Sequence, residues 1–269
     1  MPAAAAASVI RSASLTGAQE TPPTGATGTG RGAVVVNPTT LEITGGITFT
    51  GLTSTPPSAQ HIHQAPSGNP TGSGAPIISL TLAPDNATAI VPAGTFLTNA
   101  QYAALLAGEL YFNVHTSPAN PNGEIRGQIN IQGGVTAGLA TLNAAQESST
   151  GISRATGRGT IVVNSASPYD ILICYVTHNV INTTLAHIHT GAPGVSGPAN
   201  VVTLTQGTNI YTAPVAAAST PPTALTTQNF ADFMAGNTYF NVHSSNNFCG
   251  ANGNTSCSGG EIRGQIAIQ

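Results

Sequence analysis

The sequence is short of charged and aromatic side chains. Only 6% of its 269 residues are charged and 5% are aromatic, and it contains neither lysine nor tryptophan. Cytosolic proteins usually carry about a quarter charged residues. A chain that covers its surface with neutral polar residues is typical of secreted β-proteins. We therefore expect a secreted or cell-surface location.

Further absences exclude several partners and activities. Six arginines against nine acidic residues give a net charge of -3, so no basic surface is available for nucleic acid. No apolar run approaches the roughly 18 residues of a membrane span. The opening Met1–Ala7 lacks the charged and apolar regions of a whole signal peptide. Neither a nucleophile elbow nor a phosphate-binding loop is present, and we do not expect an enzyme.

The three cysteines point to an oxidising environment. Cys249 and Cys257 bracket a stretch rich in Gly, Asn and Ser, which predicts a local disulfide; two free thiols are the alternative. Cys174 lies in an apolar run and is expected to be buried. Three acceptor sequons, which a chain rich in Thr, Ser and Asn also produces by chance, are the candidate glycosylation sites: Asn86, Asn182 and Asn254.

The chain repeats itself at an offset that stays near 127 residues until the cysteine loop of the second copy lengthens it. Five blocks return in the same order: 15–20 as 142–147, 29–37 as 156–164, 61–63 as 187–189, 111–115 as 239–243, and 123–129 as 260–266. Each copy closes on Gly-Gln-Ile followed by a few residues. We therefore expect two domains, residues 1–132 and 133–269.

Each copy reads as an all-β domain. Apolar residues alternate with polar ones along short segments separated by Gly, Pro, Asn and Thr, which predicts tandem antiparallel β-sandwiches with Greek-key-like connections. One short helix is expected in each copy. In the first, residues 98–101 fit a capping box, residues 102–106 supply an apolar face, and Gly108 ends the helix; the second copy offers Thr227–Met234 followed by Gly236.

The repeated blocks resemble the CHRD domain, the module named after chordin. The motifs that carry the resemblance are Leu-x-Gly-Ala-Gln-Glu, Ala-x-His-Ile-His, Tyr-Phe-Asn-Val-His and Gly-Glu-Ile-Arg-Gly-Gln-Ile. They cover nearly the whole chain, twice. The resemblance implies an extracellular antiparallel β-sandwich of roughly 120 residues per copy.

Six of the seven histidines lie in the repeated blocks and form one triplet per copy. Two residues spaced i and i+2 on a strand face the same side, so a His-x-His pair plus a histidine from another strand can hold Cu or Zn. The His-x-His spacing is similar to that of Cu/Zn superoxide dismutase, but the further histidines and the aspartate of that enzyme are missing, so its activity is not expected. The candidate ligands are His61, His63, His115, His187, His189 and His243.

The same triplets have a second interpretation. Ile62, Val114 and Ile125 would face the core while the histidines, with Asn113 and nearby charges, form a hydrogen-bonded polar layer that fixes strand register. The seventh histidine, His178, is expected on a strand surface. Two pairs are expected to be exposed structural ion pairs, Glu124 with Arg126 and Glu261 with Arg263, which Glu20 and Glu147 could join; such pairs contribute about 0–1 kcal/mol each.

Three functions fit the sequence, and we expect the first. It is a structural or adhesive subunit that self-associates into a fibre, matrix or surface layer by adding an N-terminal strand to a neighbour. The second is a secreted Cu- or Zn-binding protein, which would need no other cofactor, and the third is an extracellular binding module. The expected assembly strand comprises Ala7, Ser8, Val9, Ile10, Arg11 and Ser12; its alternative role is the first strand of its own domain.

Overall fold

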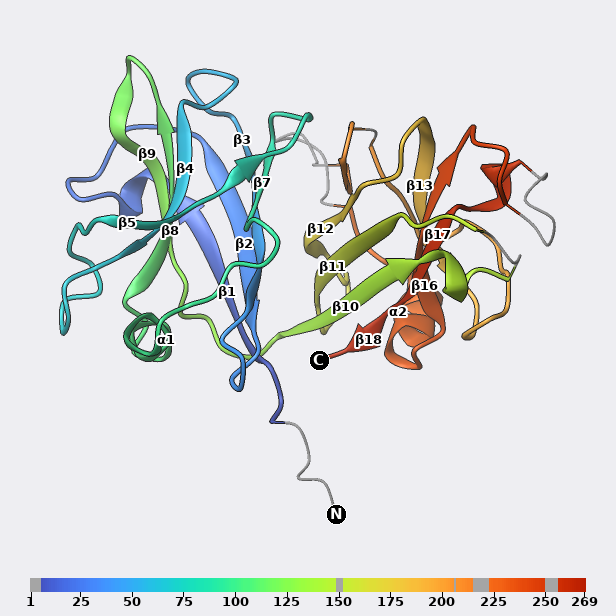
Figure 1. Cartoon of the computed structure of the whole chain (residues 1–269). Coiled ribbons are helices and arrows are strands. Elements are labelled where there is room, and N and C mark those ends of the chain that lie inside the picture. Colours follow the sequence, from blue (N-terminus) through green and yellow to red (C-terminus); the bar gives the residue numbers. More distant parts are fainter. Residues whose placement is uncertain (1–5, 149–151, 206, 215–222, 250–255) are drawn as a thin grey trace. The chain divides into compact units, whose positions relative to one another are not determined.

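The computed structural model describes residues 6–148, 152–205, 207–214, 223–249 and 256–269. Its strands form two antiparallel sheets of nine strands each, and both sheets are curled (Figure 1). Each sheet has its own cluster of buried apolar side chains. The first sheet ends at Gln128 and the second begins at Val135, so the expected boundary at residues 132 and 133 falls between them. The all-β sandwich-like architecture is thus as predicted.

The first sheet has the strand order β5-β4-β8-β9-β1-β2-β3-β7-β6. Its strands are β1 (Val9–Thr16), β2 (Thr29–Val36), β3 (Ile43–Thr50), β4 (Ala59–Gln64), β5 (Pro76–Ser79), β6 (Thr81–Leu82), β7 (Thr88–Ile90), β8 (Leu110–Thr116) and β9 (Asn120–Gln128).

The second sheet repeats this order as β14-β13-β16-β17-β10-β11-β12-β15, with β18 paired to β10. Its strands are β10 (Val135–Asn143), β11 (Thr156–Asn164), β12 (Ile171–His178), β13 (Thr183–Thr190), β14 (Val202–Thr203), β15 (Ile210–Thr212), β16 (Thr238–Ser244), β17 (Ile262–Gln265) and β18 (Ala267–Ile268).

The period-two pattern places one face of each central strand in the core. Ile62, Val114 and Ile125 are fully buried, as predicted, and their equivalents Ile188 and Val242 are at most 1% exposed. The intervening residues of the same strands form a polar layer on the other face. The site described below is built on that layer.

Both predicted helices are present. Helix α1 (Asn99–Leu106) begins with a capping box in which Thr98 and Gln101 exchange side-chain to backbone hydrogen bonds. Helix α2 (Thr227–Met234) has Thr226 as its N-cap. Gly108 and Gly236 follow the two helices with φ of 73° and 72°, the left-handed conformation that ends a helix. Neither helix, nor any other helix among the described residues, could span a membrane.

The N-terminal segment is the first strand of its own domain. Val9 to Thr16 pair with Val36 to Thr29 of β2, and on its other edge Ser12 forms a bridge with Ile131. Val9–Ser12 would have to leave this sheet to pair with a neighbouring subunit, and Ala7 and Ser8 alone are too short for a strand. The alternative given for this segment is therefore the one the fold adopts.

The cysteines lie as predicted. Cys249 and Cys257 form a disulfide, and Cys174 is a free thiol in the core. His178 is a correction: it is buried rather than on a strand surface, and its ring packs against Tyr211. His178 ends strand β12 opposite Gly157 of β11, and alternation along the strand does not show that Tyr211 of β15 covers its ring.

Two of the three sequon asparagines can be located. Asn86 and Asn182 are exposed, each with φ of 54°, and the Nδ2 of Asn182 donates to Asn246 Oδ1 at 3.1 Å. Asn254 lies outside the described residues.

Candidate metal centre

Strand register brings each histidine triplet together on the polar face of its sheet. In the first domain β4 pairs with β8 so that His61 lies opposite Asn113 and His63 opposite Tyr111. His115 is two residues beyond Asn113 on the same face, so its ring reaches diagonally across to His61. The sequence spacing predicted this convergence on one face.

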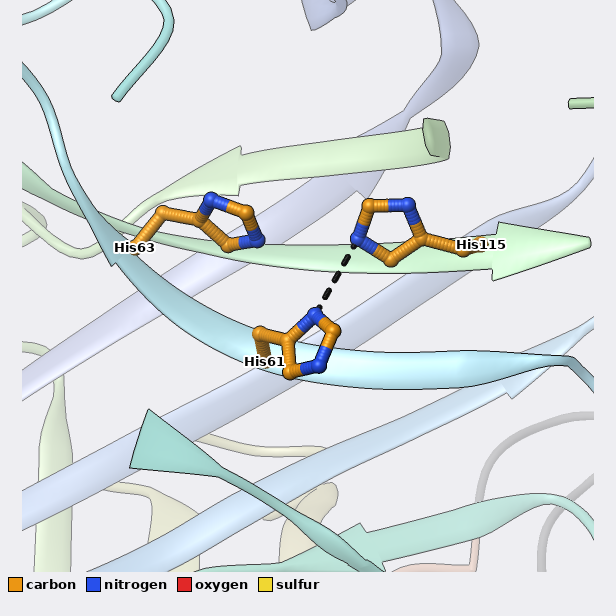
Figure 2. A group of neighbouring side chains, drawn as sticks. All are labelled: His61, His63 and His115. Carbon is orange, nitrogen blue, oxygen red and sulfur yellow. Dashed lines mark hydrogen bonds between the residues drawn. The ribbon is translucent and has the colours of Figure 1, made fainter. Parts of the chain in front are cut away.

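The three rings of the first domain point their nitrogens toward a common centre (Figure 2). Nδ1 of His61 lies 3.2 Å from Nε2 of His115. One ring nitrogen from each histidine lies within 4.8 Å of the others. Ligands of a tetrahedral zinc bound at about 2.05 Å are about 3.3 Å apart. One pair already has this separation, and modest side-chain rotation would bring in His63.

Backbone carbonyls fix the tautomers of two of these rings. The Nδ1–H of His63 donates to the carbonyl of Gly74 at 2.8 Å, and that of His115 donates to Pro121 at 3.1 Å. In each neutral ring the inward Nε2 is therefore the atom with the free lone pair. Metal-bound histidines characteristically carry such an outer hydrogen bond on the nitrogen that does not bind the metal.

The Nε2 atom of His63 is the most informative atom of the site. It is buried and has no hydrogen-bond partner, and the whole residue is only 8% exposed. A buried polar atom without a partner costs about 1–3 kcal/mol. A register-fixing polar layer would be expected to satisfy this atom, whereas a metal ligand must keep it free.

A stack of three side chains holds the ring of His63. Its centroid lies 5.0 Å from that of Tyr111, with 21° between the planes, and the Arg126 guanidinium sits 3.5 Å from the Tyr111 centroid on the ring face. The Tyr111 hydroxyl accepts a hydrogen bond from the Gly74 nitrogen at 3.0 Å. The same tyrosine thus fixes both the imidazole and the loop whose carbonyl sets its tautomer.

The second domain repeats the arrangement. Nδ1 of His187 lies 3.3 Å from Nε2 of His243. One ring nitrogen from each histidine of the triplet again lies within 4.8 Å of the others. His189 donates from Nδ1 to Gly197 at 2.9 Å, stacks on Tyr239, and leaves its Nε2 buried without a partner. Arg263 covers Tyr239 as Arg126 covers Tyr111.

Burial keeps these imidazoles neutral. Burial first, and then the proximity of the other rings of each triplet, lower the pKa of His63 and of His243 to about 4. The pKa values of His61, His115, His187 and His189 are also lowered by burial. A metal binds the neutral imidazole, so protons compete weakly at these sites near pH 7. Three neutral nitrogen donors suit Zn²⁺ or Cu²⁺ and leave a further coordination position for water.

The expected exposed ion pairs are corrected by the structure. Glu124, Arg126, Glu261 and Arg263 are at most 2% exposed. Glu124 accepts hydrogen bonds from the Thr53 backbone and hydroxyl and from Thr116, not from Arg126. The i and i+2 spacing puts Glu124 and Arg126 on one face, but neighbouring loops cover that face and supply each with separate partners.

Arg126 and Arg263 are held by backbone oxygens. Arg126 donates to the carbonyls of Pro70 and Gly72, and Arg263 donates to those of Ala192 and Val195. Each arginine therefore ties a loop down over the polar face beside its histidine triplet.

A second carboxyl lies near each triplet, buried in the first domain and partly buried in the second. Glu20 and Glu147 accept hydrogen bonds from the amides of Asn113 and Asn241. Burial raises the pKa of each to about 7, although the amide bond and the nearby arginine act in the opposite direction. Each acid links the short 3-10 helix after the first strand of its domain to the strand that carries the third histidine of the triplet.

Sequence reasoning missed the positioning groups. Tyr111 and Tyr239 were within reach, since they precede His115 and His243 by four residues and period two puts them on the same face. The carbonyls of Gly74, Pro121, Gly197 and Ser258 carry no side-chain signal, and only the folded loops show them.

Comparison with known proteins identifies the family. The family model for the CHRD domain matches residues 11–129 and again 139–266. No curated protein and no solved structure matches the chain. CHRD domains are modules of extracellular type, and the intramolecular disulfide fits that setting. The chain belongs to the CHRD domain family and carries two copies of the domain in tandem.

Proposed function

We propose that this protein acts outside the cell as a metal-binding protein that holds one Cu²⁺ or Zn²⁺ ion in each domain. The observation that carries the proposal is the pair of buried Nε2 atoms, in His63 and His189, that face two further ring nitrogens and have no other partner. Metal binding would supply the missing partner in both domains.

The alternative role as a polar layer accounts for less of the geometry. In that role His61 donates from Nδ1 to Nε2 of His115, which satisfies those two atoms. It leaves the inward Nε2 lone pair of His63 without a hydrogen-bond donor, while the outward Nδ1 proton is held by the carbonyl of Gly74. On metal binding, His61 would carry its proton on Nε2 instead, and all three lone pairs would point at the ion.

We propose binding rather than catalysis as the role of the sites. Each triplet is an isolated group of three histidines; among the described residues no fourth histidine or carboxylate completes either group. Assembly through the N-terminal strand is not part of the proposal, because β1 is already paired on both edges within its domain.

The test is a metal titration of the purified chain after removal of bound metal. We expect two equivalents of Zn²⁺ or Cu²⁺ per unmodified chain, one for His63→Ala and none for His63→Ala combined with His189→Ala. His178→Gln is the matched control, since it removes the histidine outside both triplets, and it should keep two. Cu²⁺ bound to the protein should show nitrogen hyperfine structure in its electron paramagnetic resonance spectrum.

Unchanged stoichiometry in the double variant would refute the proposed sites. Absence of stoichiometric metal in the unmodified protein would refute the function and return the triplets to a role in fixing register.

A further inference from the structure

The two metal centres differ in what holds their third histidine. In the first domain the carbonyl that accepts from His115 belongs to Pro121, in the hairpin that joins β8 to β9. That hairpin is short and closes on itself, since Thr116 pairs with Asn120 across the turn. The carbonyl is therefore placed by continuous strand pairing.

In the second domain the described residues show no such hairpin pairing. The ladder between β16 and β17 begins at Val242 with Ile262, so the described part of the connection contributes no strand pairs near His243. The carbonyl that accepts from Nδ1 of His243, at 2.8 Å, belongs instead to Ser258 in the short 3-10 helix η3 (Cys257–Gly259).

Helix η3 is anchored mainly through Cys257. That residue is fully buried, is bonded to Cys249, and donates from its backbone nitrogen to Asn246 at 2.8 Å. The hydroxyl of Ser256 caps the helix by accepting from the Ser258 nitrogen at 3.2 Å. Cys249 follows β16, the strand that carries His243, so the disulfide ties the tautomer-setting carbonyl to the ligand's own strand.

We propose that the Cys249–Cys257 disulfide positions His243 and thereby makes the affinity of the second metal centre, but not of the first, depend on this covalent link. The inference rests on the proposed function for its metal readout. Loss of the disulfide frees Ser258 to move, so His243 loses the acceptor that keeps its proton on Nδ1 and its lone pair on Nε2. Removal of such outer hydrogen bonds typically lowers metal affinity about 10–100-fold.

The experiment compares the full chain with and without Cys249→Ser and Cys257→Ser, in two single-site backgrounds. His61→Ala with His63→Ala leaves only the second centre, and His187→Ala with His189→Ala leaves only the first. Zn²⁺ affinity is measured by competition with a chromophoric chelator. We expect about 10–100-fold weaker binding at the second centre and no change at the first.

A second readout needs no metal. In the metal-free chain, ¹⁵N chemical shifts of the ring of His243 should report a proton on Nδ1 when the disulfide is present and a tautomer mixture when it is absent. The corresponding shifts of His115 should not change. This readout tests the positioning role even if neither centre binds metal, an outcome that would refute only the proposed function.

If the double serine variant unfolds the second domain, the single variant Cys249→Ser tests the covalent link, and Ser256→Ala tests the role of η3 with the disulfide intact. It removes the cap of η3 and should weaken Zn²⁺ binding several-fold at the second centre alone. An unchanged affinity of that centre, an equal loss at both centres, or a His243 proton that stays on Nδ1 without the disulfide would overturn the inference.

Discussion

The buried carboxyl of Glu20 should make the first domain less stable as pH rises, and Glu20→Gln should remove that dependence. Burial raises the pKa of Glu20 from 4.5 to about 7. Asn113 donates one amide hydrogen to the carboxyl, and its Oδ1 is buried without a partner. A protonated Glu20, or a glutamine in its place, supplies a hydrogen-bond donor near the Asn113 Oδ1 atom.

The direction follows from proton binding. Between pH 4.5 and 7 the folded state keeps the Glu20 proton while the unfolded state has released it, so the free energy of unfolding falls as pH rises through this range. A shift from 4.5 to about 7 corresponds to about 3 kcal/mol in full, of which about 2 kcal/mol falls between pH 5 and pH 8. The variant is neutral at both pH values and escapes this loss.

The assay is urea unfolding of the metal-free chain at pH 5 and pH 8, read by pulsed hydrogen exchange and mass spectrometry so that each domain is followed separately. The pulse is given at one fixed pH. We compare the free energy of unfolding of Glu20→Gln with that of the unmodified chain. The difference in favour of the variant should be about 2 kcal/mol larger at pH 8 than at pH 5, in the first domain only.

Histidine titration does not confuse the comparison. The lowered pKa of His63 has the opposite effect: the unfolded chain protonates first as pH falls below 6.5, so stability is lost toward pH 4. Both proteins share this contribution, and it cancels in their difference. A difference that is the same at pH 5 and pH 8 would refute the reasoning about Glu20.

Two further predictions address the surroundings of the first site. Tyr111→Phe removes the hydroxyl that accepts from the Gly74 nitrogen, so we expect Zn²⁺ to bind several-fold more weakly at the first centre, with the second centre and its Tyr239 as internal control in the same titration; equal affinity would show that the loop needs no such anchor. Gly123→Ala should lower the urea midpoint of the first domain by the equivalent of about 1–3 kcal/mol, because φ is 132° and the new Cβ would lie 2.6 Å from Asn113 Oδ1 and from Glu20 Oε1. Gly94→Ala, with φ of 75° and open space around it, is the matched control for strain without crowding, and a loss no larger than in that control would contradict the steric argument.

The fold was largely predictable because its signals are local. Period-two alternation placed Ile62, Val114 and Ile125 in the core, and the capping box at Thr98 located helix α1. The repeat doubled the information, since each block seen twice constrains both copies. The disulfide was also predictable, because its two cysteines are close in sequence, at a separation of 8.

The burial of several polar residues was predicted wrongly. Glu124 and Arg126 were expected to be an exposed pair, and His178 was expected on the surface, yet all three are buried. Period two decides which face a side chain occupies, but not whether a distant loop covers that face. Here the loops that contain Thr53, Pro70 and Gly72 supply the cover and the hydrogen bonds.

Comparison of the two copies separates folding requirements from ligand requirements. The buried carboxylate of Glu124 is satisfied by Thr53 and Thr116, whereas that of Glu261 is satisfied by Ser153, Ser244 and Asn246. The partners differ, but both acids have hydrogen-bond partners. This is expected of a buried polar group whose role is only to stabilise the fold.

The histidines behave in the opposite way. The outer carbonyl of the third ligand also differs, Pro121 in one copy and Ser258 in the other, yet both copies leave the same inward nitrogen unbonded, in His63 and in His189. The loops of the two copies provide different hydrogen-bond partners for the buried glutamate. Such loops could equally have provided a donor for the Nε2 atom of His63 or His189. That neither copy does so, at a cost of about 1–3 kcal/mol each, is the physical reason for our proposal that these nitrogens bind a metal rather than fix strand register.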